Sequence, residues 1–459
     1  MKMKRPTFTL MTLAVGLAFA EGACAGDFLA TYRLARQNDA QFASSRASLE
    51  AGLEKLPQGR AQLLPVINAA GNTTWNDADT KVLSTGVTTG AQFNSNGWSV
   101  TLTQPLFRWQ NLVAYKQSAY QVLQAEAQFG QATQDLIVRV AQAYFDVLAA
   151  QDSLDFSKAN KIAIAEQLAQ AKRNFEVGTA TITDTNEAQA RYDLATAQEI
   201  SANNAGEVAQ QSLQQIIGRA PDALTPLRSK LQLDPPQPAV MDDWVKSARA
   251  NNFVVKGNEA VFEISTREVD RQRAGHYPNI DVVASFQDNT TQNVQTGGAR
   301  SNVTQGQVAL QLNLPLYAGG SVLSRTREAV GLKEKARHDL ETSRRAAEFN
   351  ARQSYLNVTN GMAQVTALEQ ALVSSETALQ SNKVGYEVGV RINIDVLNAQ
   401  QQVFQTKRDL SRARYDTILH GLRLKAASGS LSEGDAEAVN RLLGYDQPAP
   451  ASPAPKPRR

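Results

Sequence analysis

The side chains best suited to specific polar chemistry occur in two copies of one short stretch. The first copy is Phe175–Ala190 and the second, 211 residues later, is Tyr386–Gln401. Both begin with an aromatic residue and Glu-Val-Gly, and both place an aspartate six positions after that glycine. The second copy adds Arg391, whose planar guanidinium can bind a carboxylate and a hydroxyl together. These stretches can therefore form directional hydrogen bonds and ion pairs.

Catalytic chemistry has no comparable candidates in the sequence. The three histidines, His276, His338 and His420, are scattered and have no metal-ligand spacing around them. No glycine-rich phosphate loop follows a predicted strand. We therefore expect no enzymatic activity, no metal site and no cofactor.

Each stretch lies at a break in a very long helical pattern. Gly178 and Gly389 mark the two breaks, and the surrounding stretches 106–220 and 316–447 contain no proline. Apolar residues between Ile137 and Leu154 recur every three or four positions, as in coiled coils. We predict two helical hairpins, each turning at a tip around its glycine. They cover 108–218 and 321–428, with helices over 108–174, 184–217, 321–384 and 394–428.

A strand pair precedes each hairpin. Residues Gln307–Leu314 alternate between apolar and polar, and so do Ile280–Phe286. We predict strand pairs within 62–107 and 277–317, with polar loops over 76–96 and 288–305. A helix is expected before each pair, over 28–56 and 242–273.

The same order of elements occurs twice. Four sequence landmarks recur at a spacing of 210 to 213 residues, which indicates a tandem duplication. We divide the chain into a first repeat (26–218), a proline-rich linker (219–240), a second repeat (241–430), a C-terminal segment (431–448) and a disordered tail (449–459).

Residues 1–25 have the anatomy of a signal peptide. Lys2, Lys4 and Arg5 precede an apolar core, and a small-x-small cleavage site ends at Ala25. Lipidation of Cys24 is the alternative reading. Cleavage leaves a nearly neutral chain, which gives no reason to expect a nucleic-acid partner. Four amphipathic strands are too few to enclose a lumen, so two, three or four copies would have to combine.

The duplicated order and the tips resemble the TolC family of outer-membrane efflux and secretion channels. The resemblance covers Asp27 to about Gly444 and includes Pro-Leu-aromatic strand ends at Pro105 and Pro315. It implies an α+β homotrimer with a twelve-stranded transmembrane β-barrel in the outer membrane of a Gram-negative bacterium. A coiled-coil α-helical tunnel would continue it into the periplasm. The partners implied are outer-membrane lipid, a periplasmic adaptor (membrane fusion protein) and an inner-membrane transporter.

The resemblance also assigns gate residues to the tips. Asp395 would contribute to an acidic ring in the pore, and Asn398 stands where some members have a second acid. Tyr386 and Arg391 would bind Asp184 and Thr183 of a neighbouring hairpin. The alternatives are that Asp395 and Asp184 are helix N-caps and that Arg391 is a solvated surface charge.

The glycine turns are the expected adaptor-docking surface. By resemblance, grooves there would be formed by Val177, Gly178, Thr179, Val388, Gly389 and Val390. The alternative is that each glycine only permits a positive φ. The implied function is export of drugs, toxic compounds or type I secreted proteins, and the sequence leaves the cargo open. A structural coiled-coil spacer or adhesin is the competing reading.

Overall fold

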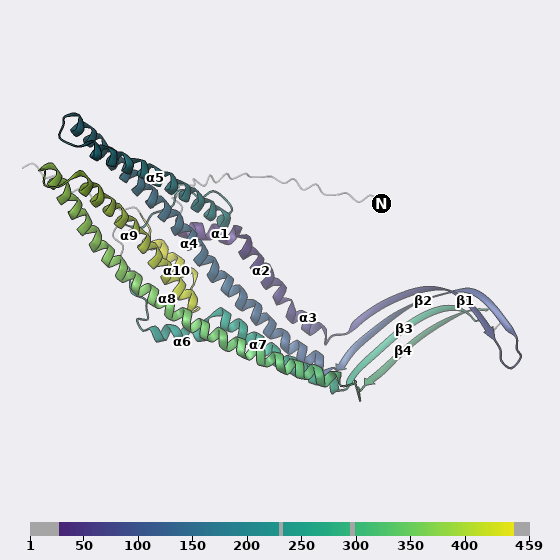
Figure 1. Ribbon diagram of the computed structural model, residues 1–459. Helices are drawn as coiled ribbons and strands as arrows, with labels where there is room; N and C mark the ends of the chain where they lie inside the picture. Colours follow the sequence, from purple (N-terminus) through teal and green to yellow (C-terminus); the bar gives the residue numbers. More distant parts are fainter. Residues whose placement is uncertain (1–26, 229–232, 294–298, 445–459) are drawn as a thin grey trace, which may run out of the picture.

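The computed structural model describes residues 27–228, 233–293 and 299–444. The predicted signal peptide (1–25, including Cys24), the predicted tail (449–459) and residues 445–448 lie outside the described residues. The chain is elongated, with helical hairpins along most of its length and a sheet projecting from one end (Figure 1). The expected combination of a four-stranded sheet and two long hairpins is confirmed.

Two antiparallel helical hairpins make up the greater part of the molecule. The first consists of α4 (Trp109–Glu176) and α5 (Ile182–Ile217), and the second of α8 (Ser321–Glu387) and α9 (Asn393–Ala427). At about 1.5 Å per residue, the 68 residues of α4 reach about 100 Å. Both hairpins turn at the end of the molecule opposite to the sheet (Figure 1).

The sheet contains four antiparallel strands in sequence order. They are β1 (Val66–Lys81), β2 (Thr88–Phe107), β3 (Asn279–Asn293) and β4 (Ala299–Asn313). The central pair, β2 and β3, joins the two repeats, with Leu102 opposite Ala284. Strands β1 and β4 are the two edges, so each leaves one side of its backbone unpaired within the protomer.

The predicted polar loops are wrong in extent, because strands occupy most of 76–96 and 288–305. In β1 and β2 the polar side chains bond across the ladder: the Asn76 amide donates to the Ser95 hydroxyl at 2.8 Å. In β3 and β4 the Thr304 hydroxyl donates to Asp288 at 2.7 Å. A solvated ribbon of this kind has the composition of a loop, which is why composition failed to identify it.

The helices expected over 28–56 and 242–273 are interrupted. The first is divided into α1 (Phe28–Asn38), α2 (Ala40–Leu53) and α3 (Lys55–Ala61), and the second into α6 (Met241–Asn251) and α7 (Phe253–Arg273), which leads into the 3₁₀ turn η1 (Ala274–His276). Asp39 accepts from the Phe42 N–H, and Asn252 accepts from the Val254 N–H. These short polar side chains start new helices by capping them.

The main apolar core lies at the middle of the hairpins, and we call it the equatorial core. It joins α4 with α1, α5, α9 and the C-terminal helix α10 (Glu433–Leu442). Phe145 lies at its centre, with ring centroids 6.5 Å from Phe28, 5.8 Å from Tyr144 and 5.5 Å from Tyr415. Elements far apart in the sequence therefore share one buried cluster.

A polar network ties α4 to α9 beside this core. Asp152 on α4 accepts hydrogen bonds from the hydroxyls of Ser411 and Tyr415 on α9, the latter at 2.8 Å. Burial, together with the negative charge of Asp152, raises the pKa of Tyr415 well above its usual value. Tyr415 therefore remains a neutral hydrogen-bond donor.

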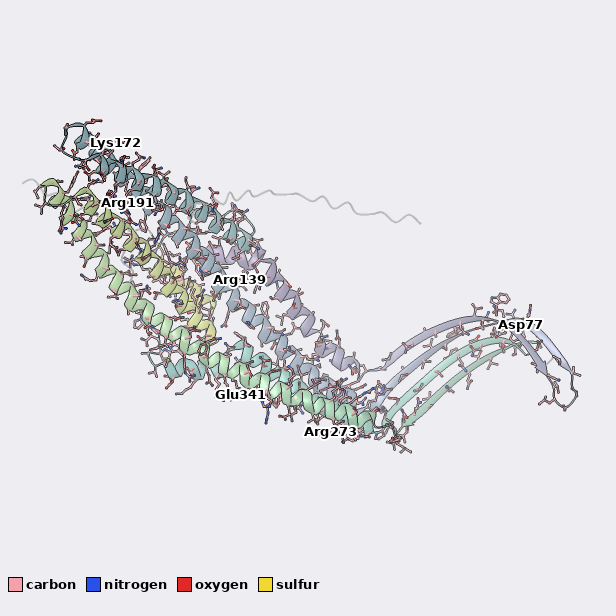
Figure 2. The ribbon with its side chains drawn as sticks, viewed as in Figure 1. Asp77, Arg139, Lys172, Arg191, Arg273 and Glu341 are labelled. Atoms are coloured by element: carbon pink, nitrogen blue, oxygen red, sulfur yellow. The ribbon has the colours of Figure 1, made fainter. Side chains whose placement is uncertain are left out.

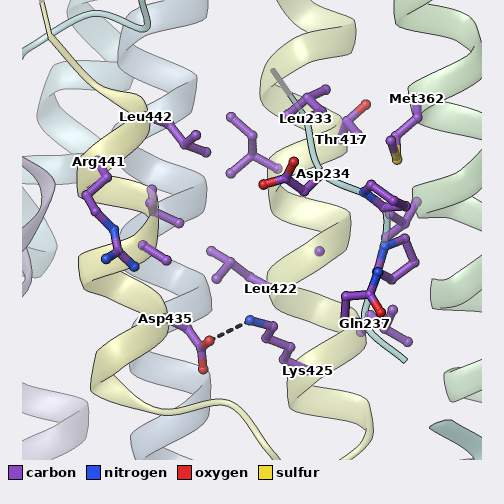
Figure 3. A pocket seen from close by; sticks show the side chains of 18 of the residues that line it. Leu233, Asp234, Gln237, Met362, Thr417, Leu422, Lys425, Asp435, Arg441 and Leu442 are labelled. Carbon is purple, nitrogen blue, oxygen red and sulfur yellow. Dashed lines mark hydrogen bonds and ion pairs between the residues drawn. The ribbon is translucent and has the colours of Figure 1, made fainter. Parts of the chain in front are cut away.

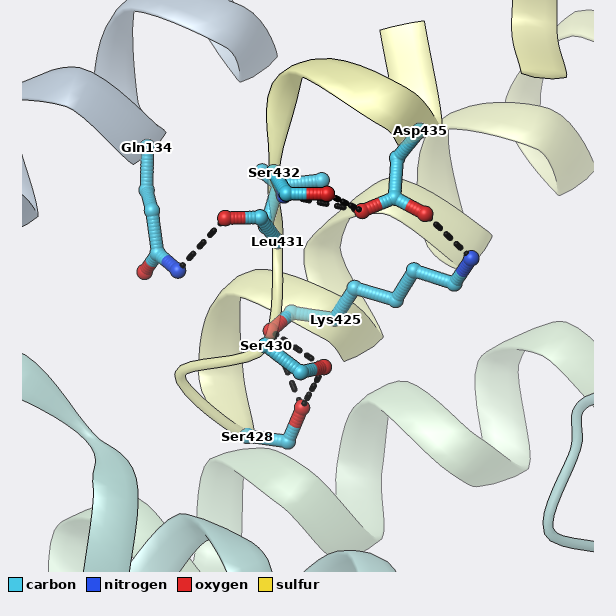
Figure 4. Close-up of polar contacts among 7 residues, drawn as sticks. All are labelled: Gln134, Lys425, Ser428, Ser430, Leu431, Ser432 and Asp435. Carbon is cyan, nitrogen blue, oxygen red and sulfur yellow. Dashed lines mark hydrogen bonds and ion pairs between the residues drawn. The ribbon is translucent and has the colours of Figure 1, made fainter. Parts of the chain in front are cut away.

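The C-terminal segment is held against the same region (Figure 4). Gln134 on α4 donates to the Leu431 carbonyl at 3.1 Å, and the Lys425 ammonium lies 2.6 Å from Asp435. Asp435 also accepts from the Ser432 N–H at 2.8 Å, which completes a capping box. Within the described residues, none of the helices combines the length and apolar character that a membrane crossing requires.

Replacing Leu213 tests the equatorial core. Leu213 on α5 has no exposed surface, so we expect Leu213→Ala to lower the unfolding free energy by about 2–5 kcal/mol. Leu83, in the turn between β1 and β2, is 92% exposed and provides the matched control, with an expected change within about 0.5 kcal/mol. Urea unfolding followed by helical circular dichroism in detergent measures both. Equal changes would contradict this core assignment.

The ion pair of Asp39 and Arg139 predicts a pH dependence. Burial alone raises the pKa of Asp39, but the Arg139 guanidinium, with both N–O distances at 3.0 Å, and the Phe42 N–H together bring it below its usual value. This stabilisation is therefore complete above the unfolded pKa, about 4, and is lost as pH falls through the lower folded pKa. Asn can still cap α2, so Asp39→Asn isolates the charge. The melting temperatures of the two proteins should converge on acidification below about pH 4, and a constant gap would argue against the ion pair.

Candidate functional site

The two tips lie at the same end of the molecule, farthest from the sheet (Figure 1). The first tip, residues 177–181, joins α4 to α5, and the second tip, residues 388–392, joins α8 to α9. Figure 2 labels Lys172 and Arg191 on the first hairpin near its tip.

Both tips use the same glycine turn. Gly178 has φ +77° and Gly389 has φ +80°, a conformation that glycine adopts without strain. In the first tip the Thr179 N–H donates to the Asn174 carbonyl at 2.8 Å, and in the second the Val390 N–H donates to the Gly385 carbonyl at 2.8 Å. A Cβ on either glycine would meet no atom within 4 Å. The backbone angle, and not crowding, therefore accounts for glycine at these positions.

The helix starts after the two turns differ. Thr181 is the N-cap of α5: its hydroxyl accepts from the Asp184 N–H at 3.3 Å, while Asp184 accepts from the Thr181 N–H at 2.9 Å. Ile392 is the N-cap of α9 and supplies no side-chain hydrogen bond. The first tip thus has a reciprocal capping box that the second lacks.

These starts correct two parts of the sequence reading. Helices α5 and α9 begin at Ile182 and Asn393, slightly earlier than expected. The aspartates Asp184 and Asp395 therefore lie in the first turn of their helices and are not N-caps. Asp395 lies 3.7 Å from the Arg391 guanidinium, a pair one turn apart at the second tip.

Polar bonds connect the two hairpins near the tips. The Asn174 amide on α4 donates to the Tyr386 hydroxyl on α8 at 3.1 Å. The Arg191 guanidinium on α5 donates to Asn398 Oδ1 at 2.9 Å and to Gln401 Oε1 at 2.6 Å, both on α9. These bonds hold each helix of the second hairpin to a helix of the first.

Leu397 adds an apolar contact between the same hairpins. It is 4% exposed and belongs to a cluster with Ile164, Leu168 and Ala171 of α4 and with Ala188 and Ala195 of α5. The start of α9 therefore packs into the groove between the helices of the first hairpin.

The expected gate pairs are not formed within this chain. Arg391 pairs with Asp395, and Tyr386 binds Asn174; within the described protomer neither side chain bonds to Thr183 or Asp184. Those pairs were expected between neighbouring hairpins of an oligomer, and they stay a prediction. Sequence reasoning missed Arg191 and Asn174. Arg191 follows Asp184 by seven residues and so lies on the same helical face, which was the available indication.

Exposed apolar side chains surround the glycine turns. Val177, Val388 and Val390 are 72%, 67% and 78% exposed. A shallow groove runs from the second tip along α8 and is lined by Thr377, Gln380, Ser381, Val384, Val388 and Val390. Both turns therefore leave apolar surface exposed at the ends of the hairpins.

A separate cavity of about 560 Å³ lies beside the equatorial core (Figure 3). Its walls include Trp244, Met362 and Leu422, and the Lys425–Asp435 ion pair closes one side. In the parts of the chain that the structure describes, no three His, Cys, Asp or Glu side chains are placed to hold a metal ion.

Comparison with known proteins places this architecture in one family. The sequence model described as "Outer membrane efflux protein" matches residues 31–219 and 244–430, one match in each repeat. Alkaline protease secretion protein AprF of Pseudomonas aeruginosa is 32% identical over 94% of this chain and 90% of its own length. Outer membrane protein TolC of Escherichia coli is 30% identical over 95% of this chain and 89% of its own length.

A solved structure shows the same fold at low identity. The CmeC outer membrane channel of Campylobacter jejuni superposes with a TM-score of 0.76 at 14% identity, covering 97% of this chain and 98% of that one. The family model spans most of the chain, and two relatives at 30% identity or more cover nearly all of it. The chain therefore belongs to the outer membrane efflux protein family.

Proposed function

We propose that three copies of this chain form a channel-tunnel that exports cargo across the outer membrane. The observation that carries the proposal is the continuity of a four-stranded sheet with two helical hairpins, in a chain of the outer membrane efflux protein family. On β4, Val308, Leu310 and Leu312 are 77%, 70% and 64% exposed, and the outer edges of β1 and β4 are unpaired within the protomer. Copies of the chain would pair these edges and turn the apolar face toward lipid.

The cargo we favour is a secreted protein. Two relatives, AprF and the proteases secretion protein PrtF of Dickeya chrysanthemi, are named for protease secretion, at 32% and 28% identity. Drugs and other toxic compounds remain the second candidate, because BepC of Brucella suis, at 23% identity, is named an efflux protein. An inner-membrane transporter and a periplasmic adaptor would deliver the cargo. No catalytic role is proposed for the chain.

The tips are the proposed gate and docking site. Asp395 of each copy would face the pore. The Arg391 side chain is 58% exposed, and its guanidinium lies 3.7 Å from Asp395, which is longer than a hydrogen bond. Arg391 would therefore remain available to Thr183 and Asp184 of the next copy. Tyr386 is already held by Asn174. The exposed Val177, Val388 and Val390, with Gly178, Thr179 and Gly389, would bind the adaptor.

The gate proposal is tested by Tyr386→Phe combined with Arg391→Ala. Removing the phenol hydroxyl and the guanidinium loosens the closed tip, so single-channel conductance in a planar bilayer should rise severalfold. The matched control is Tyr317→Phe with Arg345→Ala, since both side chains are exposed and lie away from the tips. Conductance equal to wild type in the tip variant would refute the gate assignment. A wild-type trimer that inserts without conducting would instead favour a structural spacer or adhesin.

The docking proposal is tested by replacing Gly389. We expect Gly389→Trp to abolish cross-linking to the periplasmic adaptor, because the indole would fill space that is now open. Gly389→Ala is the matched control: alanine is strained at the φ of +80° as tryptophan is, but it adds little bulk. It therefore distinguishes the effect of backbone strain from the effect of steric obstruction. Trimer migration on a gel should be unchanged in both variants. Export that continues at the wild-type rate in Gly389→Trp would refute docking at this turn.

A further inference from the structure

The guanidinium of Arg191 is the only polar group that is seen to bridge the two return helices within the described residues. It donates to Asn398 and Gln401, which stand three residues apart on one face of α9. Arginine presents two N–H groups in a planar fork, so a single side chain can satisfy both amide oxygens. The contact spans elements more than 200 residues apart, and its acceptor Asn398 directly follows Leu397, which packs against the first hairpin.

The start of α9 needs such a contact. Asn393 and Gln400 are 4% and 2% exposed, yet Asn393 Oδ1 and Gln400 Nε2 have no hydrogen-bond partner in the described protomer. Asn393 and Gln400 lie on the same helical face as Leu397, and burying their amide atoms loses the hydration of these atoms without replacement. These unpaired amide atoms disfavour the packing of α9 against the first hairpin. The exposed hydrogen bonds from Arg191 to Asn398 and Gln401 offset part of this cost.

We propose that Arg191 is a positioning residue that holds the return helix of the second hairpin against the first in the closed channel. Opening then requires its guanidinium to release Asn398 and Gln401 while α9 moves away. The inference rests on the proposed channel function and adds a link inside one protomer, distinct from links between copies.

In this role of Arg191, Asn398 acts as a hydrogen-bond acceptor. Its Oδ1 receives a bond from a charged donor, which is stronger than a bond between neutral groups. A carboxylate at the same position would form an ion pair with Arg191. We therefore expect Asn398→Asp to strengthen the closed arrangement only when Arg191 is present.

The decisive variant is Arg191→Lys. Lysine keeps the positive charge but has one ammonium in place of the fork, so it cannot reproduce both bonds. We expect Arg191→Lys and Arg191→Ala each to raise conductance severalfold in a planar bilayer. Asn398→Asp should lower conductance or leave it at the wild-type value, and Arg191→Ala with Asn398→Asp should conduct like Arg191→Ala alone. Arg412→Lys on α9, where Arg412 is 79% exposed, is the matched control.

A second measurement tests the contact made by Arg191 without relying on conductance. Cysteines placed at the exposed Val177 and Val388 can carry nitroxide labels, and pulsed electron resonance then gives the distance between the two tips. The distribution should broaden in Arg191→Lys and Arg191→Ala but not in Arg412→Lys. Wild-type conductance and a wild-type distance distribution in both Arg191 variants would overturn the inference, and so would a defect in Arg191→Ala alone. A non-conducting wild-type protein would overturn the channel proposal while the distances still report on Arg191.

Discussion

The buried contact between α4 and α9 is the constraint on which the rest of the structure depends. Phe145 packs against Tyr415 there, and Asp152 receives hydroxyl donors from the opposite helix. Separating the two helices would leave the half-buried Asp152 carboxylate without these donors, so the contact resists separation. Because this contact lies at the middle of both hairpins, it fixes how the hairpins are placed relative to each other. The sheet and the tips extend from it in opposite directions, and we call them the two arms (Figure 1).

The two arms are held in different ways. At the sheet end, the β2–β3 ladder and the Arg108–Asp281 ion pair, with contacts of 2.6 and 2.7 Å, join the repeats. At the tips, a few polar bonds and Leu397 make the connection. The first tip has the Thr181–Asp184 capping box, whereas Ile392, the N-cap residue before α9, supplies no side-chain cap. Duplicated sequences have thus produced one turn with a capping box and one turn without a side-chain cap.

Local rules predicted the parts of this fold that depend on local geometry. Proline-free periodicity and a glycine with positive φ located both hairpins, with ends within about three residues of those observed. Composition misassigned the polar ends of the strands as loops. Polar side chains such as Asn76 bond to the paired strand there, and strand pairing cannot be read from composition. The breaks at Asp39 and Asn252 each depend on the capping bonds of one side chain inside an otherwise helical pattern. Arg191 was missed because its acceptors come from the other repeat, and the gate and docking roles remain predictions.

The tip shows why a residue type at one position is a poor guide to local charge. Considered singly, Asp395 suggests an acidic pore and Asn398 a weakened one. In the structure, Arg391 lies beside Asp395, and Arg191 occupies the position facing Asn398. Asp395 and Asn398 are thus each paired with a guanidinium, Asp395 with that of Arg391 and Asn398 with that of Arg191. In the proposed trimer, closure at this level would come from directional hydrogen bonds more than from a ring of unbalanced negative charge.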